Sequence, residues 1–296
     1  MKIFDCFMYF DEDVVLELRL NVLNKFVDYF VIVESTFTHK GDTRELKFNI
    51  EKFSKFKHKI IYLVYDKEPK NIKKILDSDD ETKKSIKYIL NAAYRENGQR
   101  NFISEGLKNA QSEDLILISD VDEIPNLENF NFEGFNKKIV IFKQNMFYYK
   151  FNLKMPDLTW SGTKGCKKKY FLNPQWLRNI KDRKYSFYRL DAYFSKTKYI
   201  NVSFVNEGGW HFSNLKTAKE IEHKLKSYLH HREFDVDPIS SDKIDEIIKN
   251  KIAIYDLTLD KRERKFGEGK KLEKYSMDKL PKFLNENQNK YKEWID

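Results

Sequence analysis

Two aspartates separated by one residue, Asp120 and Asp122, directly follow an apolar run at residues 115–119 that reads LILIS. Such a run is typical of a fully buried strand, and polar residues after it lie at the carboxyl end of a parallel sheet, where α/β folds bind ligands. Carboxylate oxygens suit Mg²⁺ and Mn²⁺, which usually share them with substrate phosphates. The pair therefore predicts a metal-assisted site for a nucleotide diphosphate leaving group. The alternative is a polar loop or a helix cap, because this tripeptide is common by chance.

A second cluster of reactive side chains lies at residues 206–213, which read NEGGWHFS. Its adjacent glycines allow a positive φ angle or a close approach to a ligand. Trp210 offers a flat face for a sugar or a base, His211 can bind a metal or carry a proton, and Glu207 can act as a general base. The alternative is a tight turn in which the tryptophan and the histidine are simply buried.

The elements that must position both clusters alternate between strands and helices. Runs of β-branched and aromatic residues predict strands at 2–10, 27–34, 60–65 and 115–119. Apolar residues at helical spacing predict helices at 13–25 and 82–110. This alternation is typical of an α/β fold with a mainly parallel central sheet.

The pattern changes after residue 138. We expect antiparallel strands at 139–153, a basic region rich in turns at 160–184, and helices at 216–230 and 242–254. The last forty residues are strongly charged, and no internal repeat is found. The sequence thus predicts a catalytic domain at 1–235 and a charged helical C-terminal extension at 236–296.

The composition limits the class of protein. The 296 residues are 41% hydrophobic, which excludes a mostly disordered chain. The net charge is +9, but acidic residues interleave with the lysines and no nucleic-acid-binding motif is found, so we expect no nucleic-acid partner. No apolar stretch reaches the roughly 18–20 residues of a membrane-spanning helix. Two cysteines cannot form a disulfide framework, which favours a reducing compartment.

Basic and aromatic residues are mixed in one further segment. Lys167, Lys168 and Lys169 are followed by Tyr170, Phe171 and Trp176, and more basic residues occur at Arg262, Arg264, Lys265, Lys270 and Lys271. Such a mixture predicts peripheral contact with an anionic membrane or a lipid-linked acceptor. The alternative is an ordinary solvated face.

Several ordered segments resemble glycosyltransferase family 17, the family of the bisecting β-1,4-N-acetylglucosaminyltransferases. They are VIVES at 31–35, THKG at 38–41, LKF at 46–48, YRE at 94–96, QRN at 99–101, LILISDVDEIP at 115–125, GGWHFS at 208–213, and His231 with Glu233 and Phe234. Each segment is weak alone, but their order and spacing make the resemblance specific. It covers about residues 4–235.

The resemblance implies a GT-A type nucleotide-sugar-binding fold and an inverting transferase that uses UDP-N-acetylglucosamine with Mn²⁺ or Mg²⁺. On this basis Asp122 would ligate the metal, Asp120 would contact the ribose or a metal-bound water, and His211 would complete the metal site. Glu34 and Ser35 would contact the uridine.

Two arginines are candidates for the diphosphate, because guanidinium groups bind phosphate oxygens in a bidentate manner. They are Arg95 and Arg100, and their alternative is surface salt bridging on a helix. An inverting displacement also needs a carboxylate base, because a sugar hydroxyl is a poor nucleophile. Glu207 is the first candidate, and Asp157 and Asp191 are the others.

Partners and location follow from the same reading. We expect a UDP-sugar donor and a glycan or lipid-linked glycan acceptor. The chain lacks the N-terminal membrane anchor of the animal members, so we expect a cytoplasmic enzyme of bacterial or viral type. Two alternatives stay open. One is a sugar-nucleotide nucleotidyltransferase, although no glycine precedes Gly41 to build its phosphate loop. The other is a non-catalytic glycan- or nucleic-acid-binding module.

Overall fold

The computed structural model describes residues 1–228, 231–255 and 269–296. The side chain of Glu233, which belongs to the family resemblance, lies outside this description, and so do three of the basic residues considered for membrane contact, Arg262, Arg264 and Lys265. No helix of the described residues is long and apolar enough to cross a membrane.

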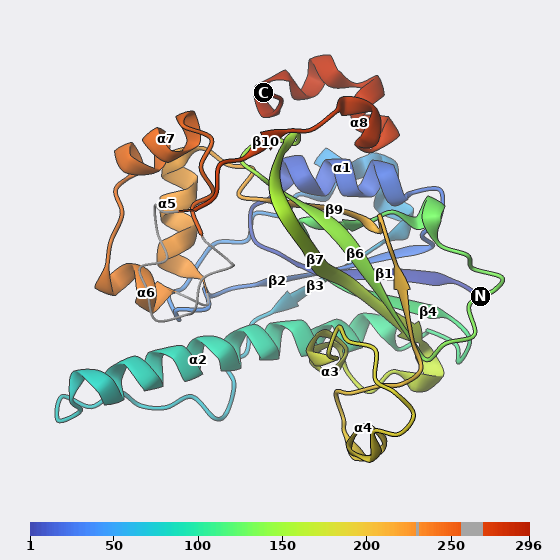
Figure 1. Cartoon of the computed structure of the whole chain (residues 1–296). Helices are drawn as coiled ribbons and strands as arrows, with labels where there is room; N and C mark the ends of the chain where they lie inside the picture. Colours follow the sequence, from blue (N-terminus) through green and yellow to red (C-terminus); the bar gives the residue numbers. More distant parts are fainter. Residues whose placement is uncertain (229–230, 256–268) are drawn as a thin grey trace.

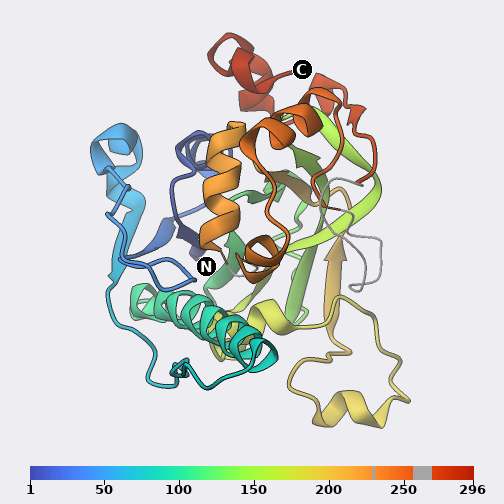
Figure 2. The same cartoon turned by 90° about the vertical axis from the view of Figure 1, so that its left-hand side faces the viewer.

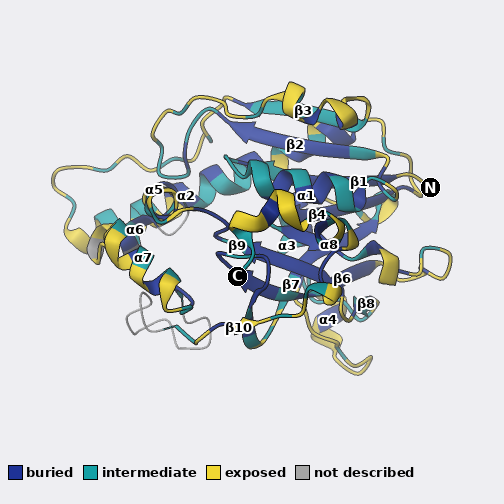
Figure 3. Ribbon diagram, turned by 90° about the horizontal axis from the view of Figure 1, so that it is seen from above, coloured by how far each residue is buried: buried dark blue, intermediate teal, exposed yellow. Residues whose placement is uncertain are grey.

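Four parallel strands form the first half of a mixed sheet (Figure 1). They are β1 (Ile3–Tyr9), β2 (Tyr29–Ser35), β3 (Ile60–Tyr65) and β4 (Leu115–Asp120), in the order β3-β2-β1-β4. All four were predicted from their β-branched and aromatic runs. Figure 3 shows β1, β2 and β4 as mostly buried, whereas the edge strand β3 is mainly of intermediate exposure.

Alternate residues of these strands enter two separate cores. Phe7, Ile32 and Leu117 pack against α1 (Asp13–Leu23), which covers one face. Cys6, Val31 and Ile118 pack on the other face, over the helical segment formed by α2 (Glu81–Phe102) and η2 (Ile103–Leu107). The predicted long helix or helix pair at 82–110 is confirmed. Because helices cover both faces of the sheet, a ligand can approach these strands only at their ends.

The second half of the sheet contains the antiparallel pairs. A hairpin of β6 (Ile139–Tyr148) and β7 (Leu153–Lys167) pairs with β4 through β7. On the other side of β6 lie β8 (Val202–Val205) and β9 (Gly209–Ser213), both parallel to it. The short β5 (Glu123–Pro125) then pairs antiparallel with β9. The molecule is thus a mixed α/β protein with a curled, mainly parallel sheet.

The predicted turn-rich region at 160–184 is wrong in its first part, because β7 continues to Lys167. The many polar residues of this stretch do not resemble a buried strand, and its glycines allow close packing of the strand against its neighbours. A Cβ atom at Gly165 would lie 2.7 Å from Leu117 and 2.9 Å from Val140. Only a glycine lets β7 lie this close to β4 and β6. The short helix α3 (Pro174–Asn179) follows.

The remaining helices lie around the sheet (Figure 2). They are α4 (Leu190–Phe194), α5 (Ala218–Ser227), α6 (His231–Val236), α7 (Ser241–Lys249) and α8 (Lys282–Glu286). Helix α5 begins with a capping box between Thr217 and Glu220 and packs with α7 on a third core. The predicted helices at 216–230 and 242–254 are therefore present, each shorter than expected.

The C-terminal segment returns to the body of the protein. Strand β10 (Glu273–Lys274) pairs with β7, and Leu280, Leu284 and Tyr291 join the core that contains α1. Its helices α7 and α8 agree with the expected helical character. The division of the chain at residue 235 stays a prediction.

Candidate active site

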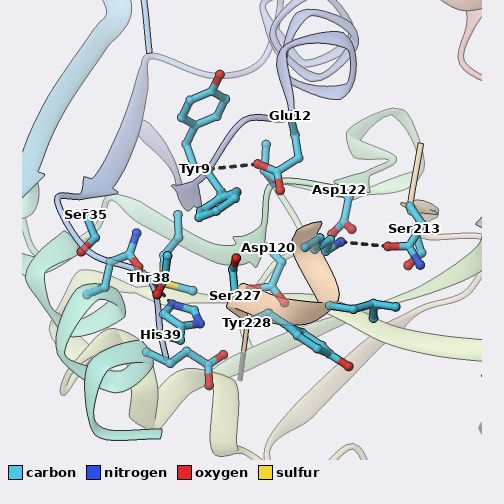
Figure 4. Close-up of a pocket in the computed structure, with 18 of the residues that line it drawn as sticks. Tyr9, Glu12, Ser35, Thr38, His39, Asp120, Asp122, Ser213, Ser227 and Tyr228 are labelled. Carbon is cyan, nitrogen blue, oxygen red and sulfur yellow. Dashed lines mark hydrogen bonds between the residues drawn. The ribbon is translucent and has the colours of Figure 1, made fainter. Parts of the chain in front are cut away.

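A cavity of about 290 Å³ opens at the carboxyl ends of β1, β2 and β4 (Figure 4). Its walls include side chains from the acidic turn after β4, from the end of β9 and from α5. Four of the residues selected from the sequence lie together in this cavity: Ser35, Asp120, Asp122 and His211. The two sequence clusters, separated by almost ninety residues, thus meet in one place.

Asp120 is held by two arginines. Nη2 of Arg178 lies 3.0 Å from Oδ2, and Nη2 of Arg100 lies 3.2 Å from Oδ1. The enclosed position of this carboxylate would raise its pKa, but the charges of Arg178 and Arg100 outweigh that effect and hold the pKa well below its usual range. Asp120 therefore stays ionised, with both oxygens already engaged by protein cations.

Asp122 faces His211. Strand β5 pairs with β9 so that Glu123 lies opposite His211, and the Phe212 amide donates to the Asp122 carbonyl at 2.9 Å. This register places Nε2 of His211 3.4 Å from Oδ1 of Asp122. Burial would raise the pKa of Asp122 and lower that of His211, but their mutual attraction reverses both directions.

Glu123 stabilises the acidic turn through hydrogen bonds of its side chain. Its buried carboxylate accepts hydrogen bonds from Arg178 at 2.7 Å and from Trp160 Nε1 at 2.7 Å, and it also accepts the Asp120 amide at 3.0 Å. The Trp160 ring lies against His211, with 5.2 Å between ring centroids. Trp160 and Glu123 therefore fix both the acidic turn and the imidazole.

A buried ion pair braces the same turn. The Arg19 guanidinium binds Asp5 at 2.7 and 2.6 Å, and neither side chain is exposed. Its Nη1 also donates to the backbone carbonyls of Asp120, Val121 and Glu123. One arginine from α1 thus donates to three backbone carbonyls of the acidic turn. Buried carbonyls need such donors, because leaving them without a hydrogen bond costs free energy.

The cavity lining also includes a further carboxylate and a neutral imidazole. Oε2 of Glu12 accepts the amides of Phe10 and Asp11 at 3.0 and 3.1 Å. Nε2 of His39 lies 3.1 Å from Oε1 of Gln99, and burial lowers the pKa of His39. Figure 4 shows Glu12, His39 and the two aspartates around the same space.

Two cations also line the cavity. Lys224 of α5 donates to Asn214 Oδ1 at 3.1 Å, and its charge contributes to the lowered pKa of Asp122. Arg44 pairs with the buried Glu34 at 3.0 Å. Because Glu34 balances the charge of Arg44, Lys224 is the cation that could meet phosphate oxygens in this otherwise acidic cavity.

Some residues selected from the sequence do not line this cavity. Glu34 is fully buried and accepts the amides of Lys47 and Phe48. Arg95 pairs with Glu68 at 2.9 Å and donates to two backbone carbonyls of the loop before Gly41. These contacts organise loops next to the cavity.

Three more residues selected from the sequence also lie outside the cavity lining. Arg100 contacts the lining residues Asp120 and Glu96 without lining the cavity itself, and Trp210 is buried with its Nε1 donating to the Lys279 carbonyl at 3.1 Å. Oε2 of Glu207 accepts a hydrogen bond from Asn145 at 3.1 Å, and its backbone has a φ of 47°. The glycine pair serves the turn: Gly209 has a φ of 130°, and a Cβ there would lie 2.1 Å from the Ile124 carbonyl.

The other two candidate bases also lie outside the cavity lining. Asp191 is paired with Arg189 and Lys198 on the protein surface, and Asp157 is an exposed residue of β7 with a φ of 55°. The roles assigned from the sequence to the residues outside the lining stay predictions.

Two of the three lysines at 167–169 share one carboxylate. Lys167 and Lys169 both pair with Glu113, at 2.9 and 2.6 Å, and Trp176 is buried. Contact of this segment with an anionic membrane stays a prediction.

The cavity holds two side chains that could ligate a divalent cation. Asp122 and His211 are adjacent donors, and Nδ1 of His211 is buried without a hydrogen-bond partner. Within the described ranges, no group of three or more His, Cys, Asp or Glu side chains has the geometry of a metal site. Two protein donors suit Mg²⁺ or Mn²⁺ when substrate phosphates and water supply the other ligands.

Sequence reasoning missed several of these functional residues. Arg19 had a usable signal, because it is a charged residue between Leu18 and Leu20 on an apolar helix. Glu12 and Lys224 lie at or within predicted helices and had no distinguishing signal. Arg178 falls in the region predicted to be turns.

Comparison with known proteins identifies the family of the chain. The family model of glycosyltransferase family 17 matches residues 1–295. Three β-1,4-mannosyl-glycoprotein 4-β-N-acetylglucosaminyltransferases, from Homo sapiens, Rattus norvegicus and Mus musculus, are 27%, 27% and 26% identical to the chain over 233 residues. The aligned part covers 72% of this chain and 40% of each relative. Since the family model matches nearly every residue, the chain belongs to glycosyltransferase family 17.

Proposed function

We propose that this protein is an inverting glycosyltransferase with a GT-A type fold, which moves N-acetylglucosamine from UDP-N-acetylglucosamine to a glycan hydroxyl. The observation that supports it most is that Asp120, Asp122 and His211 line one cavity at the carboxyl ends of parallel strands, in a chain matched by family 17 over residues 1–295. The names of the three relatives supply the sugar. The family match also favours a transferase over a nucleotidyltransferase or a binding module.

The donor would lie with its diphosphate between the acidic turn and Lys224. Lys224 would contact phosphate oxygens, and Asp122 with His211 would hold a Mn²⁺ or Mg²⁺ ion. Such a cation, when bound, neutralises charge that develops on the leaving diphosphate. Asp120, fixed by Arg100 and Arg178, would keep the turn rigid and accept a hydrogen bond from the ribose or a bound water.

The acceptor hydroxyl needs a carboxylate to take its proton. Of the described carboxylates that line the cavity, Glu96 is paired with Arg100 at 2.7 Å, whereas Glu12 receives hydrogen bonds only from two backbone amides. Glu12 is therefore our candidate for the base on the structure, and Glu207 is the candidate on the sequence. Their separate positions allow a direct test.

The decisive experiment measures UDP release from UDP-N-acetylglucosamine with Mn²⁺, with other UDP-sugars as comparison. Transferases usually hydrolyse their donor slowly without an acceptor, so release above the heat-inactivated control is expected. Addition of mannose-containing glycans should then increase the rate. No release and no metal-dependent UDP binding would overturn the proposal. Binding without release, with every glycan tested, would favour a non-catalytic module.

A further inference from the structure

One segment of the surface does not behave like the rest. Residues 181–198, here called the aromatic arm, leave the body after α3 and carry the short helix α4 at their far end (Figures 1 and 2). Five large side chains of the arm are exposed: Phe187 by 63%, Tyr188 by 73%, Leu190 by 72%, Tyr193 by 61% and Phe194 by 89%. Apolar side chains gathered in this way on a soluble protein mark an interaction surface.

The arm is anchored at its base, so its exposure is a property of the fold. The Lys181 amide donates to the Thr197 carbonyl at 2.8 Å, and Trp176 Nε1 donates to the Lys196 carbonyl at 2.8 Å. Asp182 accepts hydrogen bonds from Ser161 at 2.6 Å and from Lys143 at 3.2 Å. These hydrogen bonds hold the two ends of the arm together and against the body, while the large side chains at its tip stay exposed.

The charge of the arm indicates the partner. It contains six basic residues and two aspartates, a net charge of +4. Asp191 is paired with Arg189 and Lys198, whereas exposed Arg183, Lys184 and Lys196 form no ion pair with the residues that the structure describes. Unpaired cations beside exposed Phe, Leu and Tyr side chains match a bilayer interface, where the apolar groups enter the headgroup boundary and the cations meet anionic lipids.

We propose that the aromatic arm docks this protein on an anionic lipid membrane. The inference does not require the proposed transferase activity, and it concerns a different segment from the lysines at 167–169. A single-stranded nucleic acid would also accept aromatic and basic groups. The arm favours lipid because Leu190 offers no face for base stacking, and Phe194, the most exposed of the five, has no stacked neighbour among the described rings.

The test is co-sedimentation of the full chain with phosphatidylcholine vesicles that contain or lack phosphatidylglycerol. Binding is expected only with the anionic lipid and should fall as salt rises. The triple variant Phe187→Ser/Leu190→Ser/Phe194→Ser and the charge variant Arg183→Glu/Lys184→Glu/Lys196→Glu should each weaken binding by about tenfold or more. All six side chains are exposed, so the variants should keep the wild-type melting temperature and donor hydrolysis.

A matched control lies on α2, where Ile86 and Ile89 are 51% and 50% exposed. Ile86→Ser/Ile89→Ser should bind vesicles like the wild type. Equal loss in this control, or full binding by both arm variants, would overturn the proposal. Two further results would overturn it if the wild-type protein does not bind vesicles. One is a concentration-dependent dimer in sedimentation velocity that the triple variant abolishes. The other is oligonucleotide binding that the triple variant abolishes.

Discussion

Nε2 of His211 lies 3.4 Å from Oδ1 of Asp122, although 88 residues separate them in the sequence. The contact follows from the pairing of β5 with β9, which sets His211 opposite Glu123. Two donors of different chemistry are thereby placed at the same edge of the cavity. Their proximity is the basis of the first prediction.

Asp122→Ala should abolish sugar transfer and Mn²⁺-dependent UDP binding while the protein stays folded. Loss of one preorganised group at a developing charge typically costs about 10²–10³ in rate. The variant should fold, because the backbone carbonyl of residue 122 can still accept the hydrogen bond from the Phe212 amide. Calorimetric titration with UDP, with and without Mn²⁺, measures the effect. Wild-type affinity with Mn²⁺ in the folded variant would contradict the assignment.

Glu12→Gln and Glu207→Gln distinguish the two candidate bases. Removal of the true base should lower turnover by about 10²–10⁴ with UDP-sugar binding retained. We expect this loss in Glu12→Gln, and a rate within about threefold of wild type in Glu207→Gln, because the Glu207 carboxylate binds Asn145 outside the cavity lining. The reverse pattern in initial-rate kinetics would restore Glu207 as the base.

Arg19→Leu should reduce the free energy of unfolding by about 3–5 kcal/mol, because it leaves the Asp5 carboxylate buried without a partner. Denaturant unfolding measures this change. The double variant Asp5→Leu/Arg19→Leu should recover part of the loss, but not all of it, because the three carbonyls of the acidic turn stay without their donor. A fully stable single variant would show that the ion pair does not brace the turn.

Gly209→Ala should destabilise the protein by at least about 2 kcal/mol, because a positive φ and a clash with the Ile124 carbonyl both oppose a side chain there. Gly134→Ala is the matched control. A Cβ at Gly134 meets only the end of the flexible Asn131 side chain, so a change of about 0.5 kcal/mol or less is expected. Equal melting temperatures for the two variants would count against the argument.

Burial lowers the pKa of Lys164 to about 8. The unfolded chain then binds more protons than the folded one between pH 8 and the ordinary lysine pKa of 10.5. This residue should therefore add stability as the pH rises through that window, by roughly 3 kcal/mol at most. Unfolding curves of Lys164→Met should lack this increase relative to wild type, whereas Lys181→Met, at an exposed lysine, should keep it.

The sequence predicted the parallel strands well, because burial on both faces selects unbroken runs such as LILIS at 115–119. It failed for β7, whose Thr, Ser, Gly and Lys residues do not resemble a buried strand. That strand is specified by its neighbours: Leu117 and Val140 occupy the space that a side chain at Gly165 would need. Such pairings between distant segments leave no local pattern.

The candidate site shows the same limit. Asp120, Asp122 and His211 could be found because their types and positions carry the chemistry. Trp210 and His211 could not both face the cavity, because successive residues of a strand point to opposite sides. Arg178 and Glu12 were missed, since only the folded chain brings Arg178 to the acidic turn and Glu12 into the cavity lining.

The Arg19 brace also bears on how the chain matures as it leaves the ribosome. Asp5 and Arg19 emerge early and can find each other at once, but Ser119 and the carbonyls at 120, 121 and 123 appear a hundred residues later. Until then the guanidinium lacks most of its final acceptors. The ion pair between β1 and α1 therefore reaches its full set of hydrogen bonds only when β4 and the acidic turn are in place, whereas β9 and α5, which complete the cavity, follow still later in the chain.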